Sequence, residues 1–378
     1  MSSKYDPRHV SFVNAISPSL TSFLIRLRGW LNRRCPWVLR WCAVPYGTVA
    51  RLRRTGYQRG WLPRHRLPKP VISVGNITVG GTGKTPFVMW LASRLHEQGK
   101  RVAILSRGYG RQGSAANMLV SDGTSLKAGW QAVGDEPVLM AQKCPWAIVA
   151  VGKDRYRLGR WVLEQAACDC FLLDDGFQHL PLYRDLDILV FDATDVEGLA
   201  EVLPAGGMRE PLSATQWATT IVFSRTESVP SVEPLQTRIE QCVGKSIAPV
   251  LVETAPRWLI HIATGMTRGI DFFKKQSLLL VSGVGNPSSF RFCVVSCGLD
   301  VGDEIRYADH YAYSEKDVKE IRLKMKSLGI DHAITTEKDA LKLRDFLRGD
   351  DPVWALDVQV IMTQGEDRIR KMLHDICP

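Results

Sequence analysis

The sequence predicts an α/β protein in which a parallel sheet has helices on both faces and is followed by a second, smaller α/β unit. The first prediction rests on short apolar runs, rich in β-branched residues, that alternate with helical stretches. These runs are 71–74, 101–106, 147–151, 170–173, 187–191 and 220–224. Residues 116–122 are interpreted as a small hairpin insertion.

The second unit is predicted to begin near residue 276. Apolar runs at 278–282, 332–336 and 353–360 are interpreted as strands, with helices after Pro287 and over 314–328. We therefore expect three parts: basic amphipathic helices in 1–66, a nucleotide-binding domain in 67–275 and a smaller α/β domain in 276–378.

Composition excludes several classes of protein. The chain has 378 residues, of which 45% are hydrophobic and 23% are charged, so it is neither disordered nor fibrous. No stretch of 18 or more apolar residues predicts a transmembrane helix. The nine cysteines form no Cys-x-x-Cys pair, which argues against zinc and favours reduced thiols in the cytoplasm.

Basic charge is concentrated at the start of the chain. Residues 1–96 carry 16 Lys/Arg and one acid, whereas the rest carries 33 Lys/Arg and 38 Asp/Glu. Pro36 separates an apolar helical stripe from a second aromatic and basic stretch that extends to Trp61, so two short helices are expected. The stripe consists of Leu20, Phe23, Leu24, Leu27, Trp30 and Leu31.

Arginines beside exposed apolar residues are typical of helices that lie in a membrane surface. The alternative is a helix packed on its own protein, with its arginines solvated. Nucleic acid is a weaker candidate, because the stretch is too apolar for a simple phosphate-binding face and no recognition module follows it. We predict contact with a membrane surface and none with nucleic acid.

A glycine-rich loop lies between the first predicted strand and a helix. This strand, loop and helix order is that of a P-loop, in which backbone N–H groups surround phosphate oxygens. Lys84 would neutralise the transferring phosphate and Thr85 would bind Mg²⁺. Thr78 stands where the usual pattern begins with glycine. The predicted nucleotide-binding residues here are Thr78, Val79, Gly80, Gly81, Thr82, Gly83, Lys84 and Thr85.

Paired acids after another predicted strand supply candidate metal ligands. Asp174 and Asp175 follow the run 170–173, and a P-loop needs a carboxylate at the end of a neighbouring strand. Asp135 and Glu136 open an apolar helical segment, where helix capping is an equally good interpretation. No guanine-reading Asn/Thr-Lys-x-Asp element is present, so ATP is preferred over GTP.

With these motifs in place, the chain resembles the tetraacyldisaccharide 4′-kinases, the lipid A 4′-kinases of Gram-negative bacteria, over nearly its whole length. The resemblance is carried by Ser73-Val74-Gly75-Asn76 with the P-loop, Ser106-Arg107-Gly108-Tyr109, Gly134-Asp135-Glu136-Pro137, Asp174-Asp175-Gly176-Phe177-Gln178-His179, Leu203-Pro204-Ala205-Gly206, Arg209-Glu210-Pro211, 283–287, Asp309-His310-Tyr311 and Thr335-Thr336-Glu337-Lys338-Asp339-Ala340.

The resemblance implies transfer of the ATP γ-phosphate to the 4′-hydroxyl of a tetraacylated glucosamine disaccharide 1-phosphate, which forms lipid IVA. It implies that Asp135 and His310 act as a dyad that takes the proton of the acceptor hydroxyl, with Lys84 as the third catalytic residue. The alternative function is a membrane-associated P-loop ATPase switch without a lipid acceptor. Val79 weakens this alternative, because partitioning ATPases have lysine at that position.

Other roles follow from the same family motifs. Thr85, Glu136, Asp174 and Asp175 are the candidate Mg²⁺ ligands, and Gln178 is a candidate nucleotide contact. Arg107 and Arg209 are candidate contacts to the substrate, although each could equally form a structural salt bridge. The expected partners are the lipid A disaccharide precursor and the inner-membrane surface, on its cytoplasmic side, with no obligate protein partner.

Overall fold

A computed structural model of the chain describes residues 27, 30–31, 33–111, 113 and 115–378. Its strands are β1 (Val71–Gly75), β2 (Val102–Ser106), β3 (Asn117–Asp122), β4 (Ile148–Gly152), β5 (Cys170–Asp174), β6 (Leu186–Asp192), β7 (Thr220–Ser224), β8 (Val250–His261), β9 (Thr267–Arg268), β10 (Ser277–Ser282), β11 (Asp300–Arg306), β12 (His332–Thr336) and β13 (Val353–Gln364).

The α-helices are α2 (Pro36–Gln58), α3 (Lys84–Glu97), α4 (Trp130–Val133), α5 (Asp135–Lys143), α6 (Arg155–Gln165), α7 (Glu233–Val243), α8 (Pro287–Ser296), α9 (Glu315–Leu328), α10 (Glu337–Leu343) and α11 (Glu366–Ile376). Shorter 3₁₀ helices are η1 (Glu197–Leu199), η2 (Leu212–Trp217), η3 (Thr226–Ser228), η4 (Ile270–Phe273) and η5 (Arg344–Phe346).

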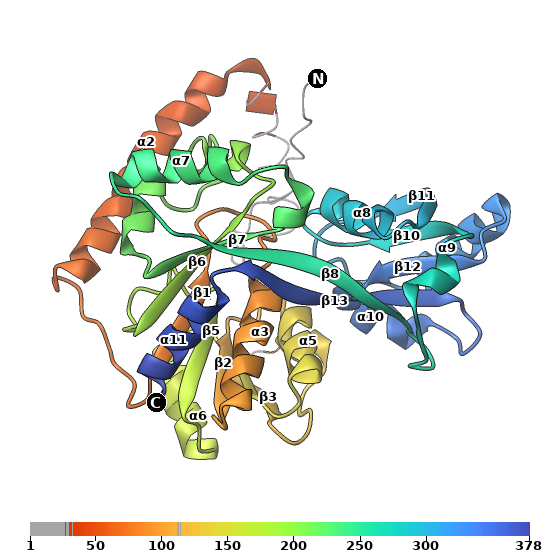
Figure 1. Cartoon of the computed structure of the whole chain (residues 1–378), viewed down its shortest axis with the longest axis horizontal. Coiled ribbons are helices and arrows are strands. Elements are labelled where there is room, and N and C mark those ends of the chain that lie inside the picture. The colour runs from red at the N-terminus through yellow and green to blue at the C-terminus, as the bar shows by residue number, and fades with distance from the viewer. Residues whose placement is uncertain (1–26, 28–29, 32, 112, 114) are drawn as a thin grey trace.

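The strands join in one sheet, in the order β11-β10-β12-β13-β8-β7-β6-β1-β5-β2-β4-β3, with β9 paired to β8. The predicted α/β class is confirmed, since most neighbours are parallel and only β3/β4, β8/β9 and β8/β13 are antiparallel among the described strands. The long strands β8 and β13 connect the two halves of the sheet (Figure 1). Residues 116–122, interpreted as a small hairpin insertion, contain β3, which turns back through an antiparallel bridge between Ser121 and Leu126 and also pairs with β4 at the edge of the main sheet.

Helices cover both faces of the half that contains β1. Alternate residues of each buried strand point to opposite faces, so Ile72 packs with α3, α5 and α11, whereas Val71 packs with α6. In the other half, α9 lies against Leu279 and α8 against Leu278. Ile369 and Leu373 of α11 belong to the same core as Ile72. The domain limits at 67–275 and 276–378 stay a prediction.

Helix α2 lies along the outside of the half that contains β1 (Figure 1). It is a single 23-residue helix that includes Pro45, and the predicted helix before Pro36 lies mostly outside the described residues. Its inner side is fixed by the buried guanidinium of Arg54, which donates to Glu210 at 2.5 and 2.8 Å and to the carbonyl of Phe177 at 3.0 Å. None of the described helices is both long and apolar enough to cross a membrane.

Replacing Arg54 by methionine is expected to destabilise the protein, because it leaves the Glu210 carboxylate buried without its partner. Loss of one member of a buried ion pair costs about 3–5 kcal/mol. Urea unfolding measures this cost, with Arg51→Met as a control on an exposed position of the same helix. Equal free energies of unfolding for the two variants would contradict this function of Arg54.

Candidate active site

The P-loop lies at the carboxyl end of β1, in the centre of the sheet. Gly75 ends β1 and Lys84 begins α3, so the loop residues 76–83 precede a helix amino terminus, where backbone N–H groups are unpaired by the helix. Gly80 and Gly83 have φ angles of 109° and 74°, which favour glycine at these positions. Gly80 and Gly81 are exposed, whereas Thr78 and Thr82 are buried.

Some of the predicted phosphate-binding backbone is already engaged. The N–H of Val79 donates to the carbonyl of Gly207 at 2.8 Å, and Thr78 forms a β-bridge with Met208. The outer part of the loop consists of the exposed Gly80 and Gly81. The first turn of α3, which contains Thr85, follows the loop. The roles of the individual loop residues stay predictions.

Two acids at the end of β5 face this loop, because β5 is the parallel neighbour of β1 and Val74 is paired with Asp174. Asp175 accepts from the guanidinium of Arg209 at 3.0 and 2.9 Å, and its carboxylate lies 3.5 Å from the ammonium of Lys84. Burial alone would raise the pKa of Asp175, but Arg209 and Lys84 lower it well below its ordinary value. Asp175 is therefore charged and bound within the protein.

Asp174 has a different environment. One carboxylate oxygen accepts from Ser106 at 3.2 Å, and the other is buried with no hydrogen-bond partner among the described residues. Burial, together with the charges of Glu136 and Asp175, raises the pKa of Asp174 to about 7. An oxygen of this kind fits a divalent cation, since Mg²⁺ binds one or two carboxylates together with waters and phosphates. In the described part of the chain, no three His, Cys, Asp or Glu side chains form a complete metal cage.

A third acid, Asp135, is hydrogen-bonded to His310, which lies 175 residues further along the chain. The Nδ1 atom of His310 lies 3.0 and 3.1 Å from the two carboxylate oxygens of Asp135. Asp135 is the first residue of α5 and only 4% exposed, and the preceding Gly134 has a φ of 97°, with the carbonyl of Tyr109 where a Cβ would lie. Glycine at 134 thus lets α5 begin directly beside the imidazole.

The charges around the pair set its protonation. Burial alone would raise the pKa of Asp135, but the hydrogen bond with His310 and the charges of Lys338 and Lys342 lower it well below the ordinary range. For His310 the effects have the opposite sign. Burial alone would lower its pKa, but the hydrogen bond with Asp135 raises it above its ordinary value. Asp135 is therefore ionised. The charge of Glu136, the residue after Asp135 in α5, also acts on Asp174 at the end of β5.

The other predicted residues have distinct places. Gln178 donates to the carbonyl of Asn76 at 2.8 Å, at the base of the P-loop, and its own amide oxygen is buried without a partner among the described residues. Arg209 is bound to Asp175 and Asn76, as its alternative interpretation as a salt-bridge residue expected. Arg107 is exposed beside Tyr109. The substrate roles of Arg107 and Arg209 remain predictions.

Comparison with known proteins identifies the family of this chain. The sequence profile of the family described as tetraacyldisaccharide-1-P 4′-kinase matches residues 35–377. The chain belongs to this family. The tetraacyldisaccharide 4′-kinase of Geobacter sulfurreducens is 39% identical over 83% of this chain and 86% of its own length. The enzyme of that name from Aquifex aeolicus is 36% identical over 88% of this chain and 96% of its own.

A crystal structure agrees with the fold of this family member. The structure of the Aquifex aeolicus LpxK, described as an "apo" form in complex with ATP, superposes with a TM-score of 0.74 at 35% identity. It covers 93% of this chain and all of that one. The suspected family resemblance is thereby confirmed.

The sequence analysis missed several charged groups of the site in this family member. Lys338 and Lys342 lie beside Asp135 and His310, and the buried Arg155 acts electrostatically on Asp174 and Asp175. A signal for the lysines exists, because their spacing of four residues places both on one face of α10. We find no signal in the sequence that distinguishes Arg155 from a surface arginine.

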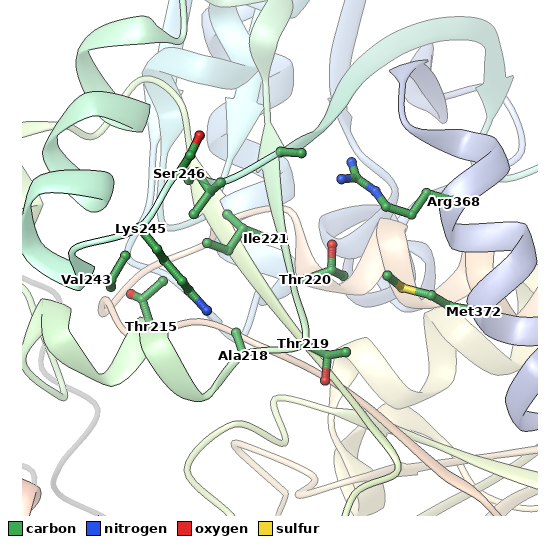
Figure 2. Close-up of a pocket in the computed structure, with 12 residues that line it drawn as sticks. Thr215, Ala218, Thr219, Thr220, Ile221, Val243, Lys245, Ser246, Arg368 and Met372 are labelled. Carbon is green, nitrogen blue, oxygen red and sulfur yellow. The ribbon is translucent and has the colours of Figure 1, made fainter.

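A cavity of about 190 Å³ lies apart from this site (Figure 2). It is next to Thr220, the first residue of β7, whereas the P-loop and the acids follow the last residues of parallel strands. Its lining includes Lys245 from the loop after α7 and Met372 of α11. We assign it no part in the chemistry.

His179, the last residue of the Asp174–His179 motif, is expected to make stability depend on pH. Burial lowers its pKa to about 3, and Nε2 of its ring accepts the backbone N–H of Arg155 at 3.2 Å, so the folded ring is neutral. An unfolded histidine has a pKa of about 6.5. Between these values only the unfolded chain binds the proton, so this contribution is complete above pH ~6.5 and is lost as the pH falls towards 3.

Urea unfolding at pH 7 and pH 5 measures this dependence. His179→Gln is expected to lose less stability on acidification than the parent, by at most about 1.4 kcal/mol per pH unit. The exposed His374→Gln should keep the parental dependence. If the stability of His179→Gln depended on pH as that of the parent does, protonation of His179 would not contribute to the loss of stability in acid.

Proposed function

We propose that this chain is a lipid kinase that transfers the γ-phosphate of ATP to the 4′-hydroxyl of a tetraacylated glucosamine disaccharide 1-phosphate and forms lipid IVA. One observation carries the proposal: a carboxylate hydrogen-bonded to an imidazole adjoins Glu136, whose charge acts on Asp174 at the end of the strand next to the P-loop strand. The family membership supports it, and so does the complex of the related Aquifex aeolicus LpxK with ATP.

Each residue has a role in the proposed transfer. The 4′-oxygen attacks the γ-phosphorus, the bond to the oxygen that bridges the β- and γ-phosphates breaks, and ADP leaves. The proton of the hydroxyl passes to Asp135, which His310 holds in place. Lys84 neutralises charge on the transferring group. The outer P-loop backbone binds the phosphates of ATP.

Mg²⁺ is the proposed metal, and the residues at the end of β5 fit it. Asp174 offers its unpaired buried oxygen, and Glu136 and Thr85 complete the group of ligands from the two neighbouring helices. Asp175 is less available, because both of its oxygens accept from Arg209. When bound, Mg²⁺ would reduce the negative charge of the phosphates.

We also propose the division into a domain of residues 67–275, which supplies Asp135, and one of 276–378, which supplies His310. The two regions meet where β8 of the first pairs with β13 of the second, and α11 of the second region packs on the core of the first. The dyad therefore requires both parts of the chain.

Asp135→Asn is expected to lower kcat by about 10² to 10⁴-fold, since the amide cannot accept the proton. ATP should still bind, because Asp135 does not belong to the P-loop. The assay follows labelled γ-phosphate into the disaccharide lipid and measures free phosphate in parallel, with the exposed Asp300→Asn as a control. Hydrolysis of ATP by the parent without a phosphorylated lipid would favour the alternative, a P-loop ATPase switch.

We further propose that the chain binds the cytoplasmic surface of the inner membrane through α2. Trp37 and Trp41 are 61% and 74% exposed, and Val44 and Leu52 continue the same side of the helix. Exposed arginines, such as Arg33 and Arg51, accompany this apolar side. Together they form an apolar face with basic flanks, which suits anionic lipid headgroups.

The double variant Trp37→Ser/Trp41→Ser is expected to sediment less with phosphatidylglycerol vesicles. Each tryptophan loses roughly 1.4 kcal/mol of apolar burial, which is about tenfold in binding, so the double variant should bind roughly a hundredfold more weakly. Trp217→Ser removes a tryptophan that is 42% exposed elsewhere on the protein and should bind as the parent does. Unchanged binding of the double variant would exclude this face as the membrane contact.

A further inference from the structure

Helix α10 presents two lysines to the Asp135–His310 pair. The helix packs against α5, which begins at Asp135, and Lys338 and Lys342 are four residues apart, so they lie on the same side. At its start, Glu337 pairs with Lys143 at the end of α5. The two helices are thus joined by ion pairs at both ends, since Lys342 reaches Asp135.

Lys338 contacts the ring nitrogen of His310 that faces away from Asp135. Its Nζ atom lies 3.2 Å from Nε2 of His310, and also 3.1 Å from Asp309 Oδ1 and 3.5 Å from Glu136 Oε1. An ammonium group has donors and no acceptor, so Nε2 must accept. The proton of a neutral imidazole is then on Nδ1, where it is donated to Asp135.

Lys342 acts on the carboxylate of the pair. Its side chain is 1% exposed, and Nζ lies 3.3 Å from Oδ2 of Asp135 and 3.2 Å from Oδ1 of Asp339. The other oxygen of Asp135, Oδ1, accepts the backbone N–H of Glu136 at 2.9 Å. Oδ1 is therefore hydrogen-bonded, whereas Oδ2 lies opposite the ammonium of Lys342, which has no hydrogen-bond partner among the described residues and acts on the carboxylate through its charge.

We propose that Lys338 and Lys342 are positioning residues: Lys338 keeps the proton of His310 on Nδ1, and Lys342 keeps Asp135 oriented to receive the proton of the acceptor. This inference rests on the proposed kinase function and deepens it. With Nδ1 donating and Nε2 accepting, the ring has no free lone pair for the acceptor hydroxyl. The carboxylate of Asp135 is then the proton acceptor, and His310 is its support.

Such a role suits phosphoryl transfer. The transition state is loose, so correct placement of the hydroxyl contributes more than the strength of the base. A misplacement of about 1 Å costs on the order of 10²-fold in rate. Loss of either lysine should therefore reduce kcat more than it changes the KM for ATP, which the P-loop sets.

The first experiment reads the tautomer without using activity. Nitrogen NMR of the full-length chain labelled at histidine distinguishes a protonated from an unprotonated ring nitrogen, and His310→Gln identifies the His310 signals by their absence. We expect a protonated Nδ1 in the parent and loss of this preference in Lys338→Met. Lys338→Gln, whose amide still donates, should keep it. A proton on Nε2 in the parent, or an unchanged tautomer in Lys338→Met, would overturn the inference.

The second experiment compares kinetics. Lys338→Met and Lys342→Met should lower kcat by on the order of 10²-fold with a KM for ATP within about twofold of the parent. Lys338→Gln and Lys342→Arg should recover part of kcat, and the exposed Lys319→Met should equal the parent. If Lys342→Met does not fold, the kcat values of Lys342→Arg, Lys338→Met and Lys338→Gln test the inference. Equal kcat in Lys338→Met and the parent would overturn the inference.

The two experiments separate this inference from the proposed function. A parent protein that phosphorylates no lipid contradicts the kinase proposal, and the NMR measurement still tests the placement of the proton. A parent that is an active lipid kinase, with Lys338→Met equally active, contradicts the inference alone.

Discussion

Pairing of buried charge is the constraint on which the site depends. Asp135 and Asp174 are buried and Asp175 is partly buried at one edge of the sheet, and each unpaired buried charge there would cost several kcal/mol. Neighbouring cations offset this cost: Lys84 and Arg209 at Asp175, and the lysines of α10 at Asp135. Of these three acids, Asp174 remains under-neutralised. Asp174 is therefore suited to the proposed Mg²⁺, next to the loop proposed to bind phosphate.

Local patterns were sufficient for the sheet and the P-loop. Buried parallel strands are short, apolar and β-branched, so the runs 71–74, 170–173 and 220–224 were recognisable, and the structure places β1, β5 and β7 there. Glycines at special φ angles and a lysine before a helix likewise have a local cause. The hairpin expected at 116–122 did not indicate that β3 also joins the main sheet beside β4, because an edge strand and an isolated hairpin share the same alternation.

Contacts between distant residues had no such local signal. The approach of His310 to Asp135 depends on how β8 and β13 carry the second half of the sheet, and the family resemblance rather than the residues suggested it. The sequence likewise could not predict whether Arg209 binds the substrate or an acid of the protein. The planar guanidinium matches the geometry of a phosphate and of a carboxylate equally well. Lys342 is an extreme case, since a lysine in an amphipathic helix normally faces water, and here tertiary packing buries it.

The return of α11 to the first core affects how the protein is made. Ile369, Leu373 and Cys377 complete the hydrophobic cluster that begins with Ile72, although most of the chain separates them. On the ribosome, the strands around the P-loop emerge long before this helix does, so the apolar surface that α11 covers stays exposed until α11 has been made. The part of this core that α11 covers is thus buried only after the second half of the sheet has been made, and a chaperone that shields exposed apolar surface would act in that interval.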